Sequence, residues 1–205
     1  MKPFTKNELI GTVVILTIIG FITFKNILVA ERRARDSQRQ ADISAVADAL
    51  QAFFDDYGYF PPSEDGYIKA CKSEKFAAIL EEVKRLKEFD RNKYFEGLTK
   101  CVWGKDAFTD LLDEAYTLYL RAIPKDPRED SGLRYFYISN QNRYQIYTAL
   151  EGKSDEDTYN SGIVSRNLAC GNEICSFGKS YGETPLDKSI EEYEQELIEL
   201  QKKQK

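Results

Sequence analysis

The sequence predicts an α+β protein in which a long N-terminal, membrane-spanning helix packs on a small antiparallel sheet, with a helical insertion and a C-terminal helix. Three observations lead to this prediction. An apolar run fills residues 4–30, helical spacing continues from it without a break to Tyr57, and two β-rich runs flank a short turn at residues 140–142. This combination favours one membrane stem that carries one head.

The apolar run contains one acid near its start, Glu8, and no charged residue between Leu9 and Phe24. A helix needs roughly 20 apolar residues to cross a bilayer core of about 30 Å, and this run meets that length. No basic region of useful length precedes it, and no small-residue cleavage site ends it. We therefore interpret the run as a retained membrane anchor and not as a removable secretory signal.

The helix is predicted to continue out of the membrane, because no glycine or proline occurs between Phe21 and Tyr57. From Phe4 to Tyr57 it would be about 80 Å long. Gly58 and the pair Pro61-Pro62 forbid further continuation.

One face of this second half of the helix is apolar and is expected to pack on the head. It is formed by Ile43, Val46, Ala47, Leu50, Phe53, Phe54 and Tyr57. Arg35, Asp36 and Arg39 are assigned to the polar faces.

With about 60 residues in the helix, roughly 145 remain, enough for one globular domain of ordinary size. Apolar residues at helical spacing predict a helix at 74–89 and another at 106–123, which Pro124 would end. The stretch between them, 90–104, is aromatic and irregular. We interpret the two helices as an insertion between the long helix and the sheet.

Strand signals begin only after Asp126-Pro127. The runs at 133–139 and 143–150 are rich in tyrosine and β-branched residues and flank a short polar turn, so they predict a β-hairpin. Residues 151–178 are expected to form a loop with one more short strand near Ile163-Val164. Residues 186–203 predict a highly charged helix with a thin apolar stripe.

The composition excludes several classes of function. The net charge is −5 and no basic patch occurs beyond residue 39, which disfavours a head that binds nucleic acid. The chain contains no histidine, so Ser-His-Asp and Cys-His catalysis and the commonest zinc ligand are absent. We therefore expect a protein that is not an enzyme, although a hydrolase with paired carboxylates is only weakly disfavoured.

The four cysteines all follow the long helix and are Cys71, Cys101, Cys170 and Cys175. Four cysteines permit three pairings. Pairing of nearest neighbours, Cys71 with Cys101 and Cys170 with Cys175, closes the smallest loops and is preferred here. Disulfides would place the head in an oxidising, extracytoplasmic compartment. Four buried free thiols are the alternative, and a zinc cluster is disfavoured because paired C-x2-C knuckles are absent.

The order of several motifs resembles that of type IV pilins and of the pseudopilins of type II secretion. Residues 4–9, FTKNEL, are similar to the start of the mature family sequence, with Glu8 at the position of its glutamate. Residues 55–62, DDYGYFPP, resemble the element after a pseudopilin helix. Residues 123–127, IPKDP, followed by Tyr135, Tyr137 and Tyr144, resemble the stretch that leads into the family's small sheet.

This resemblance implies a pilin-like fold and a division of the chain. Residues 1–3 would be a short leader, 4–30 the transmembrane helix, 31–60 the extracytoplasmic half of that helix, 61–184 the globular head and 185–205 a charged helical tail. The chain would be a single-pass membrane protein with its head outside the cytoplasm, in a periplasmic or cell-surface filament.

The resemblance also implies a mode of assembly. After a prepilin peptidase exposes the amine of Phe4, Glu8 would pair with that amine on a neighbouring subunit. Copies would form a helical homo-oligomeric filament with the pilus or secretion machinery. An acid in the headgroup zone with no partner is the alternative for Glu8, although an acid in an apolar segment is costly enough to suggest a function.

Two features depart from the family. Pro3 stands where the family has the glycine at which its peptidase cleaves, so the chain would be cleaved unusually or used uncleaved. Arg32, Arg33 and Arg35 follow the apolar run, and the positive-inside rule would place them in the cytoplasm. The resemblance and the cysteines favour the opposite orientation.

An acidic cluster at Asp155, Glu156 and Asp157 follows the predicted hairpin. G-type pseudopilins bind calcium in this region, so the resemblance suggests a calcium site here, and oxygen ligands suit that ion. The spacing is not that of an EF-hand, and a solvated acidic loop is the preferred interpretation. No other cofactor is expected. The alternative to a filament subunit is a membrane-anchored extracytoplasmic binding module that does not polymerise.

Overall fold

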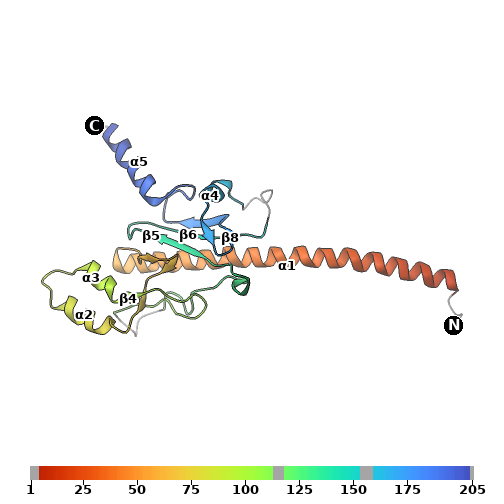
Figure 1. Ribbon diagram of the computed structural model, residues 1–205, viewed down its shortest axis with the longest axis horizontal. Coiled ribbons are helices and arrows are strands. Elements are labelled where there is room, and N and C mark those ends of the chain that lie inside the picture. The colour runs from red at the N-terminus through yellow and green to blue at the C-terminus, as the bar shows by residue number, and fades with distance from the viewer. Residues whose placement is uncertain (1–4, 113–117, 153–158, 204–205) are drawn as a thin grey trace.

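The structure, a computed structural model, describes residues 5–112, 118–152 and 159–203. A single long helix, α1 (Lys6–Tyr57), carries a head of short helices and small antiparallel sheets. Figure 1 shows the first half of α1 projecting from the head as a bare rod, with the head packed around its second half. The predicted α+β class, with a long N-terminal helix, is confirmed.

Both ends of α1 have clear local causes. Thr5 is the N-cap, and the helix ends at Gly58, whose φ of 74° is the left-handed conformation that glycine adopts easily. Its 52 residues correspond to about 78 Å. Among the described residues it is the one helix long and apolar enough to cross a membrane, and its apolar part makes no contact that buries it.

The remaining elements are short. In chain order they are β1 (Ser63–Glu64), β2 (Tyr67–Ile68), β3 (Cys71–Lys72), α2 (Phe76–Lys84), α3 (Arg91–Glu96), β4 (Leu98–Thr99), the 3-10 helix η1 (Glu129–Ser131), β5 (Phe136–Ser139), β6 (Tyr144–Thr148), α4 (Ser161–Ser165), β7 (Ala169–Cys170), β8 (Glu173–Ile174), β9 (Phe177–Ser180) and α5 (Ile190–Lys203).

The largest sheet has the strand order β5-β6-β9, and every pairing in it is antiparallel. The predicted hairpin is confirmed as β5 and β6, with Phe136 opposite Tyr147, although both strands are shorter than expected. The third strand, β9, was expected to be loop. Its sequence FGKS has little of the β-branched character that predicts a strand, and it is held by the edge of β6.

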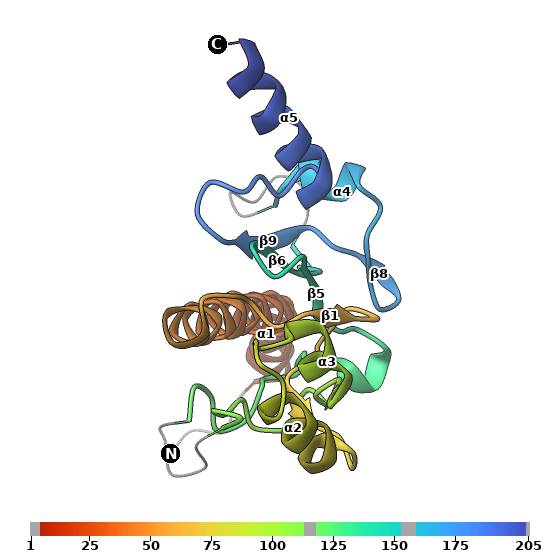
Figure 2. The same cartoon turned by 90° about the vertical axis from the view of Figure 1, so that its left-hand side faces the viewer.

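The head has layers on two sides of α1. Figure 2 shows β6 and β9 on one side of the helix and α2 and α3 on the other. The central strand β6 is buried along its whole length because both of its faces are covered. Tyr144 and Ile146 join the core around α1, whereas Tyr147 joins a second core cluster on the far face of the sheet.

The apolar stripe predicted on α1 forms the centre of the main core. Ile43, Val46 and Leu50 are completely buried, and Phe53 is 1% exposed. Phe53 lies against Phe108 with ring centroids 5.3 Å apart. The stripe is therefore intramolecular core along its main part, as its spacing indicates.

The predicted helix at 106–123 is wrong for the residues that the structure describes there. Phe108 and Leu120 instead form an antiparallel bridge, with the N–H of each donating to the carbonyl of the other at 2.9 and 3.0 Å. The Asp106 carboxylate accepts a hydrogen bond from the N–H of Val102 at 2.7 Å and fixes the turn before this bridge. In the described parts of this stretch the backbone is irregular, and the rings of Phe108 and Tyr119 pack against Phe53.

Three further expectations need correction. Ile163 and Val164 lie in the short helix α4 and not in a strand, because the Asn160 side chain caps the N–H groups of Gly162 and Ile163. The stretch 90–104, which was expected to be irregular, contains the short helix α3 and the strand β4. The helices predicted at 74–89 and 186–203 are present but shorter, as α2 and α5.

Candidate functional site

The first turn of α1 positions Glu8. Its carboxylate accepts hydrogen bonds from the N–H and the hydroxyl of Thr5, at 2.7 and 2.8 Å, while the Thr5 hydroxyl accepts from the N–H of Glu8 at 3.4 Å. This is a capping box, which satisfies two donors at the start of the helix. Glu8 therefore has an intrachain partner, and it lies at the exposed tip of the stem. Phe4, its predicted intermolecular partner, lies outside the described residues.

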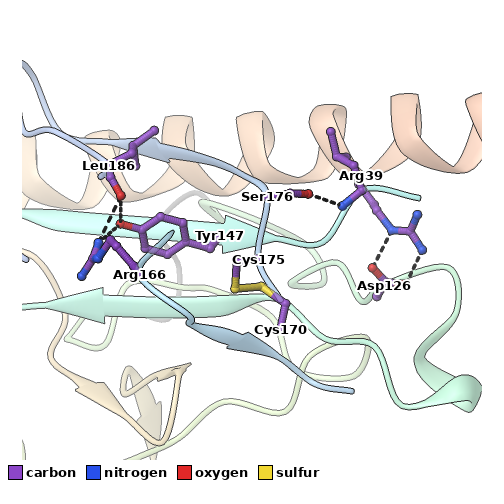
Figure 3. The surroundings of a disulfide bond; sticks show 9 residues. Arg39, Asp126, Tyr147, Arg166, Cys170, Cys175, Ser176 and Leu186 are labelled. Carbon is purple, nitrogen blue, oxygen red and sulfur yellow. Dashed lines mark hydrogen bonds and ion pairs between the residues drawn. A yellow bond between two sulfur atoms is a disulfide. The ribbon is translucent and has the colours of Figure 1, made fainter. Parts of the chain in front are cut away.

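The junction between stem and head, here called the neck, contains a buried arginine. Arg39 is completely buried and donates from Nε to Asp126 Oδ2 at 2.7 Å and from Nη2 to Asp126 Oδ1 at 3.0 Å. Figure 3 shows this pair bridging α1 and the segment that precedes η1. The Nη1 of Arg39 also donates to Asp36 at 2.8 Å and to Glu151 at 2.9 Å. One guanidinium thus contacts three carboxylates.

Two of these carboxylates tie α1 to the end of β6. The Asp36 carboxylate accepts from the backbone N–H groups of Glu151 and Gly152, both at 2.9 Å. Glu151 accepts two hydrogen bonds from Arg35, at 2.8 and 2.7 Å, and one from Arg128 at 3.3 Å. Charge-assisted, two-pronged contacts of this kind fix orientation as well as distance. The helix is held in one register against the sheet.

In the neck, contacts between opposite charges stabilise the charged forms of Arg39 and Glu151. Burial disfavours the charged form of Arg39, but the hydrogen bonds that Arg39 donates to Asp126 and Glu151 outweigh this effect, and the pKa of Arg39 is raised. The hydrogen bond from Arg35 is the largest influence on Glu151, and together with Arg39 it lowers the pKa of Glu151 to about 2 despite burial. Arg39 and Glu151 are therefore both charged at neutral pH.

The polar-face assignment of Asp36 and Arg39 is wrong, since both are buried. Arg39 lies four residues before Ile43 and Asp36 three residues before Arg39, so both continue the apolar stripe toward the membrane. This spacing is the signal that could have predicted the burial of Asp36 and Arg39. It was not sufficient, because charged residues are rarely buried without partners, and the partners of these two residues lie far along the chain.

Tyrosines secure the same helix farther along. The hydroxyl of Tyr135 donates to Asp42 at 2.7 Å, and that of Tyr57 donates to Asp110 at 2.6 Å. Burial raises the pKa of Asp42, although the Tyr135 hydrogen bond opposes this. The pKa of Tyr135 is also raised, first by burial and then by Asp42. These tyrosines remain neutral donors over the physiological range, so their contacts are structural.

Two disulfides join the loops of the head, Cys71 to Cys101 and Cys170 to Cys175. This is the pairing that the smallest-loop argument prefers. Figure 3 shows the second disulfide beside Tyr147, in the core cluster that also contains Leu133 and Ile163. Tyr147 donates its hydroxyl to the carbonyl of Leu186 at 3.1 Å, and Arg166 donates to the same carbonyl at 3.2 Å.

The suggested calcium ligands Asp155, Glu156 and Asp157 lie outside the described residues. Within the described part of the chain, no group of three or more His, Cys, Asp or Glu side chains is placed to hold a metal ion. The described residues thus include a capping box at the tip of the stem, a cluster of buried ion pairs at the neck and two disulfides in the head. The exposed apolar side chains of the stem suit an apolar environment.

The fold and these features define an α+β protein with a membrane-length stem and a disulfide-bonded head. Comparison of the chain with models of protein families, with curated proteins and with solved structures finds no match in any of the three.

Proposed function

We propose that this chain is a structural subunit of a type IV pilus-like or type II secretion pseudopilus filament. Its stem would hold it in the membrane first and would then pack against the stems of other copies. The head would lie on the extracytoplasmic side, where disulfides form and persist. Prepilin peptidase and the assembly machinery would be its partners, and its work would be mechanical.

The observation that carries the proposal is the division of α1 into a bare half and a packed half. In the bare half, the side chains of Leu9, Phe21 and Phe24 are 58–65% exposed, and the other apolar side chains are exposed to a similar degree. In the packed half, Ile43 and Leu50 are completely buried. A continuous apolar surface of this size requires lipid or other apolar helices to cover it. One helix thus anchors the chain and forms the centre of its head.

Glu8 supplies the proposed contact between subunits. Its carboxylate lies one turn from the tip of the stem and is held by Thr5. In an assembled filament, the amine of Phe4 on a neighbouring subunit would meet this carboxylate in an apolar setting. There, an unpaired charge is costly and a charged pair is favoured.

Variants at two positions test this contact in cells that build surface filaments. Glu8→Gln removes the charge but keeps a side chain that can complete the capping box. It is expected to abolish filaments seen by electron microscopy, while the head keeps both disulfides. Thr5→Val removes the cap and keeps the charge, and it should still assemble. Normal filaments from Glu8→Gln would exclude the proposed pairing.

The second candidate function is a single-pass anchored binding module that does not polymerise. Pro3 favours it, because proline precedes Phe4 where the resembled family has glycine. Mass spectrometry of the mature chain separates the two functions. A chain that starts at Phe4, with or without N-methylation, supports the filament subunit. An intact Met1 together with monomers in the membrane supports the anchored module.

A further inference from the structure

The bare half of α1 has one face on which the side chains repeat at steps of three and four residues. Figure 1 shows this half as a rod without contacts, and every residue of α1 up to Glu31 is exposed. Side chains at these steps lie on one side of a helix and form the seam where two parallel helices pack together. The seam residues are Thr12, Ile15, Ile19, Ile22, Asn26 and Val29.

Asn26 is a polar member of this seam that lies inside the apolar run. It precedes Ala30, where the run ends, by four residues, or about 6 Å along the helix axis. The long side chain of Lys25 can reach the headgroups from this depth, whereas the shorter side chain of Asn26 cannot.

The amide of Asn26 has no hydrogen-bond partner in the described part of the chain. The hydroxyl of Thr12, by contrast, donates to the carbonyl of Glu8 at 2.8 Å and is satisfied within its own helix. Burying an amide in apolar surroundings without a hydrogen bond is costly. In a bilayer, Asn26 therefore favours a partner from another chain.

A second copy of this chain offers the same amide at the same depth, because copies of one membrane protein carry their heads on the same side. A carboxamide both donates and accepts, so two Asn26 side chains can satisfy each other. Asparagine forms such hydrogen bonds between membrane helices. A single asparagine in the seam of two parallel helices also fixes their register and their number.

Like charges limit the seam at both ends. Glu8 lies four residues before Thr12, and Arg33 lies four residues after Val29, on the same side of the helix. Two copies of either charge would repel each other in an in-register pair. The contact is therefore confined to residues 12–29, which span about 27 Å of a hydrocarbon core about 30 Å thick.

The head leaves room for a second stem on this side. Beyond the seam, the same side of α1 carries small side chains that the head does not cover, those of Ala34, Ser37 and Ala41. Small residues allow neighbouring helices to approach closely. A copy placed along the seam thus meets an open face of α1 where the packed half begins.

We infer that this face pairs the stems of two copies in parallel and in register, with the two Asn26 amides hydrogen-bonded to each other within the bilayer. The inference rests on the proposed function and deepens it, because it names a contact between copies that precedes filament assembly. Neighbouring copies in a helical filament are displaced along the fibre axis, so identical residues of two stems do not meet there. The in-register pair is therefore a separate contact from that of Glu8 with Phe4.

Cross-linking through single cysteines tests the pair, because all four native cysteines are in disulfides and a stem cysteine is then the one free thiol. The full chain is reconstituted in liposomes of phosphatidylethanolamine and phosphatidylglycerol with excess lipid and no assembly machinery. After oxidation with copper phenanthroline, Ile15→Cys and Ile22→Cys are each expected to give a disulfide-linked dimer on a non-reducing gel. An antiparallel pair would not join identical residues at these two positions, since both lie away from the middle of the stem.

Thr17→Cys and Phe24→Cys are the matched controls. They place the thiol at similar depths but on the opposite side of the helix, and both are expected to remain monomeric. Equal cross-linking at the seam and control positions would show random collision and would overturn the inference. Absence of cross-links at Ile15→Cys and Ile22→Cys would overturn it as well.

The role of the amide is tested in the Ile22→Cys chain. Asn26→Leu is expected to lower the association constant, measured over a series of lipid dilutions, about tenfold. Asn26→Gln keeps an amide and should restore most of the pairing. Thr17→Leu makes a similar apolar change on the opposite side and should pair like the parent chain. Unchanged pairing in Asn26→Leu would exclude the proposed hydrogen bond.

The pair and the filament fail separately. Glu8→Gln lies outside the seam, so it is expected to cross-link at Ile22→Cys like the parent chain even if it builds no filaments. Normal filaments from a chain whose stems do not cross-link in liposomes would remove the pair and leave the filament proposal standing.

Discussion

Arg39 on α1 and Asp126, 87 residues later in the chain, form a two-pronged ion pair in which both side chains are almost completely excluded from water. Arg39→Met is expected to lower the free energy of unfolding by about 3–5 kcal/mol, because three carboxylates lose their shared buried cation. Chemical denaturation of the full chain in detergent, followed by circular dichroism, measures this.

Arg33→Met is the matched control for that substitution, since Arg33 is exposed on the same helix. Its stability should lie within about 0.5 kcal/mol of the wild type. Similar losses in the two variants would show that the Arg39 ion pairs contribute no more than a surface charge.

Glu151 predicts a dependence of stability on acid pH. Its pKa falls from 4.5 to about 2 on folding, chiefly through the hydrogen bond from Arg35. A carboxyl group whose folded pKa is depressed stabilises the fold above its unfolded pKa, and it loses this contribution as pH falls toward the folded value. Stability is therefore expected to decline between pH 4.5 and about 2.

Glu151→Gln should be less stable than the wild type at pH 7, and its stability should change less over the same acid range. Denaturation midpoints measured at several pH values give both curves. Parallel curves for the two proteins would mean that another group controls the acid transition.

The disulfide between Cys71 and Cys101 closes a loop with a sequence separation of 30, whereas that between Cys170 and Cys175 closes one of 5. Loss of chain entropy in the unfolded state predicts that replacing both members of the first pair with alanine costs about 3.6 kcal/mol. The same change at the second pair should cost about 2 kcal/mol by loop length. Thermal denaturation of both double variants compares them, and the reverse order would contradict the loop-length argument.

Gly171 predicts a steric effect at the β7–β8 turn. Its φ is +84°, and an added Cβ would lie 1.9 Å from the carbonyl oxygen of Gly132, a backbone atom that cannot move aside alone. Gly171→Ala is expected to cost at least about 2 kcal/mol.

Gly182→Ala is the control for Gly171, because Gly182 also has a positive φ, +56°, but no atom lies within 4 Å of its added Cβ. It should cost about 1 kcal/mol, the conformational penalty alone. Equal melting temperatures of the two variants would show that Gly132 does not constrain the turn.

The sequence allowed the elements with strong local signals to be predicted. The unbroken spacing from Lys6 to Tyr57 predicted α1, and the runs around Gln141 predicted the β5–β6 hairpin. Local signals failed where long-range contacts decide the structure. Phe108 and Leu120 have helical spacing, but they pair with each other in an antiparallel β-bridge. Phe177 lies in a strand because it pairs with Thr148 at the edge of β6.

The candidate site was predictable to a similar degree. The cysteine pairing followed from loop size and is confirmed. The assembly role of Glu8, suggested by an acid in an apolar run, stays a prediction. The Arg39 cluster could not be predicted, since its members come from three distant segments and only their contacts make burial of a charge acceptable.

Because α1 is one continuous helix, the stem and the head are expected to tilt together. Membrane helices commonly tilt by about 20°, and roughly 38 Å of α1 lies between Arg32 and Tyr57. A tilt of that size would swing the outer end of the head sideways by roughly 13 Å, with no hinge at the neck to absorb it. If the stem lies in a membrane, small changes in its tilt would thereby become large displacements at the far end of the head.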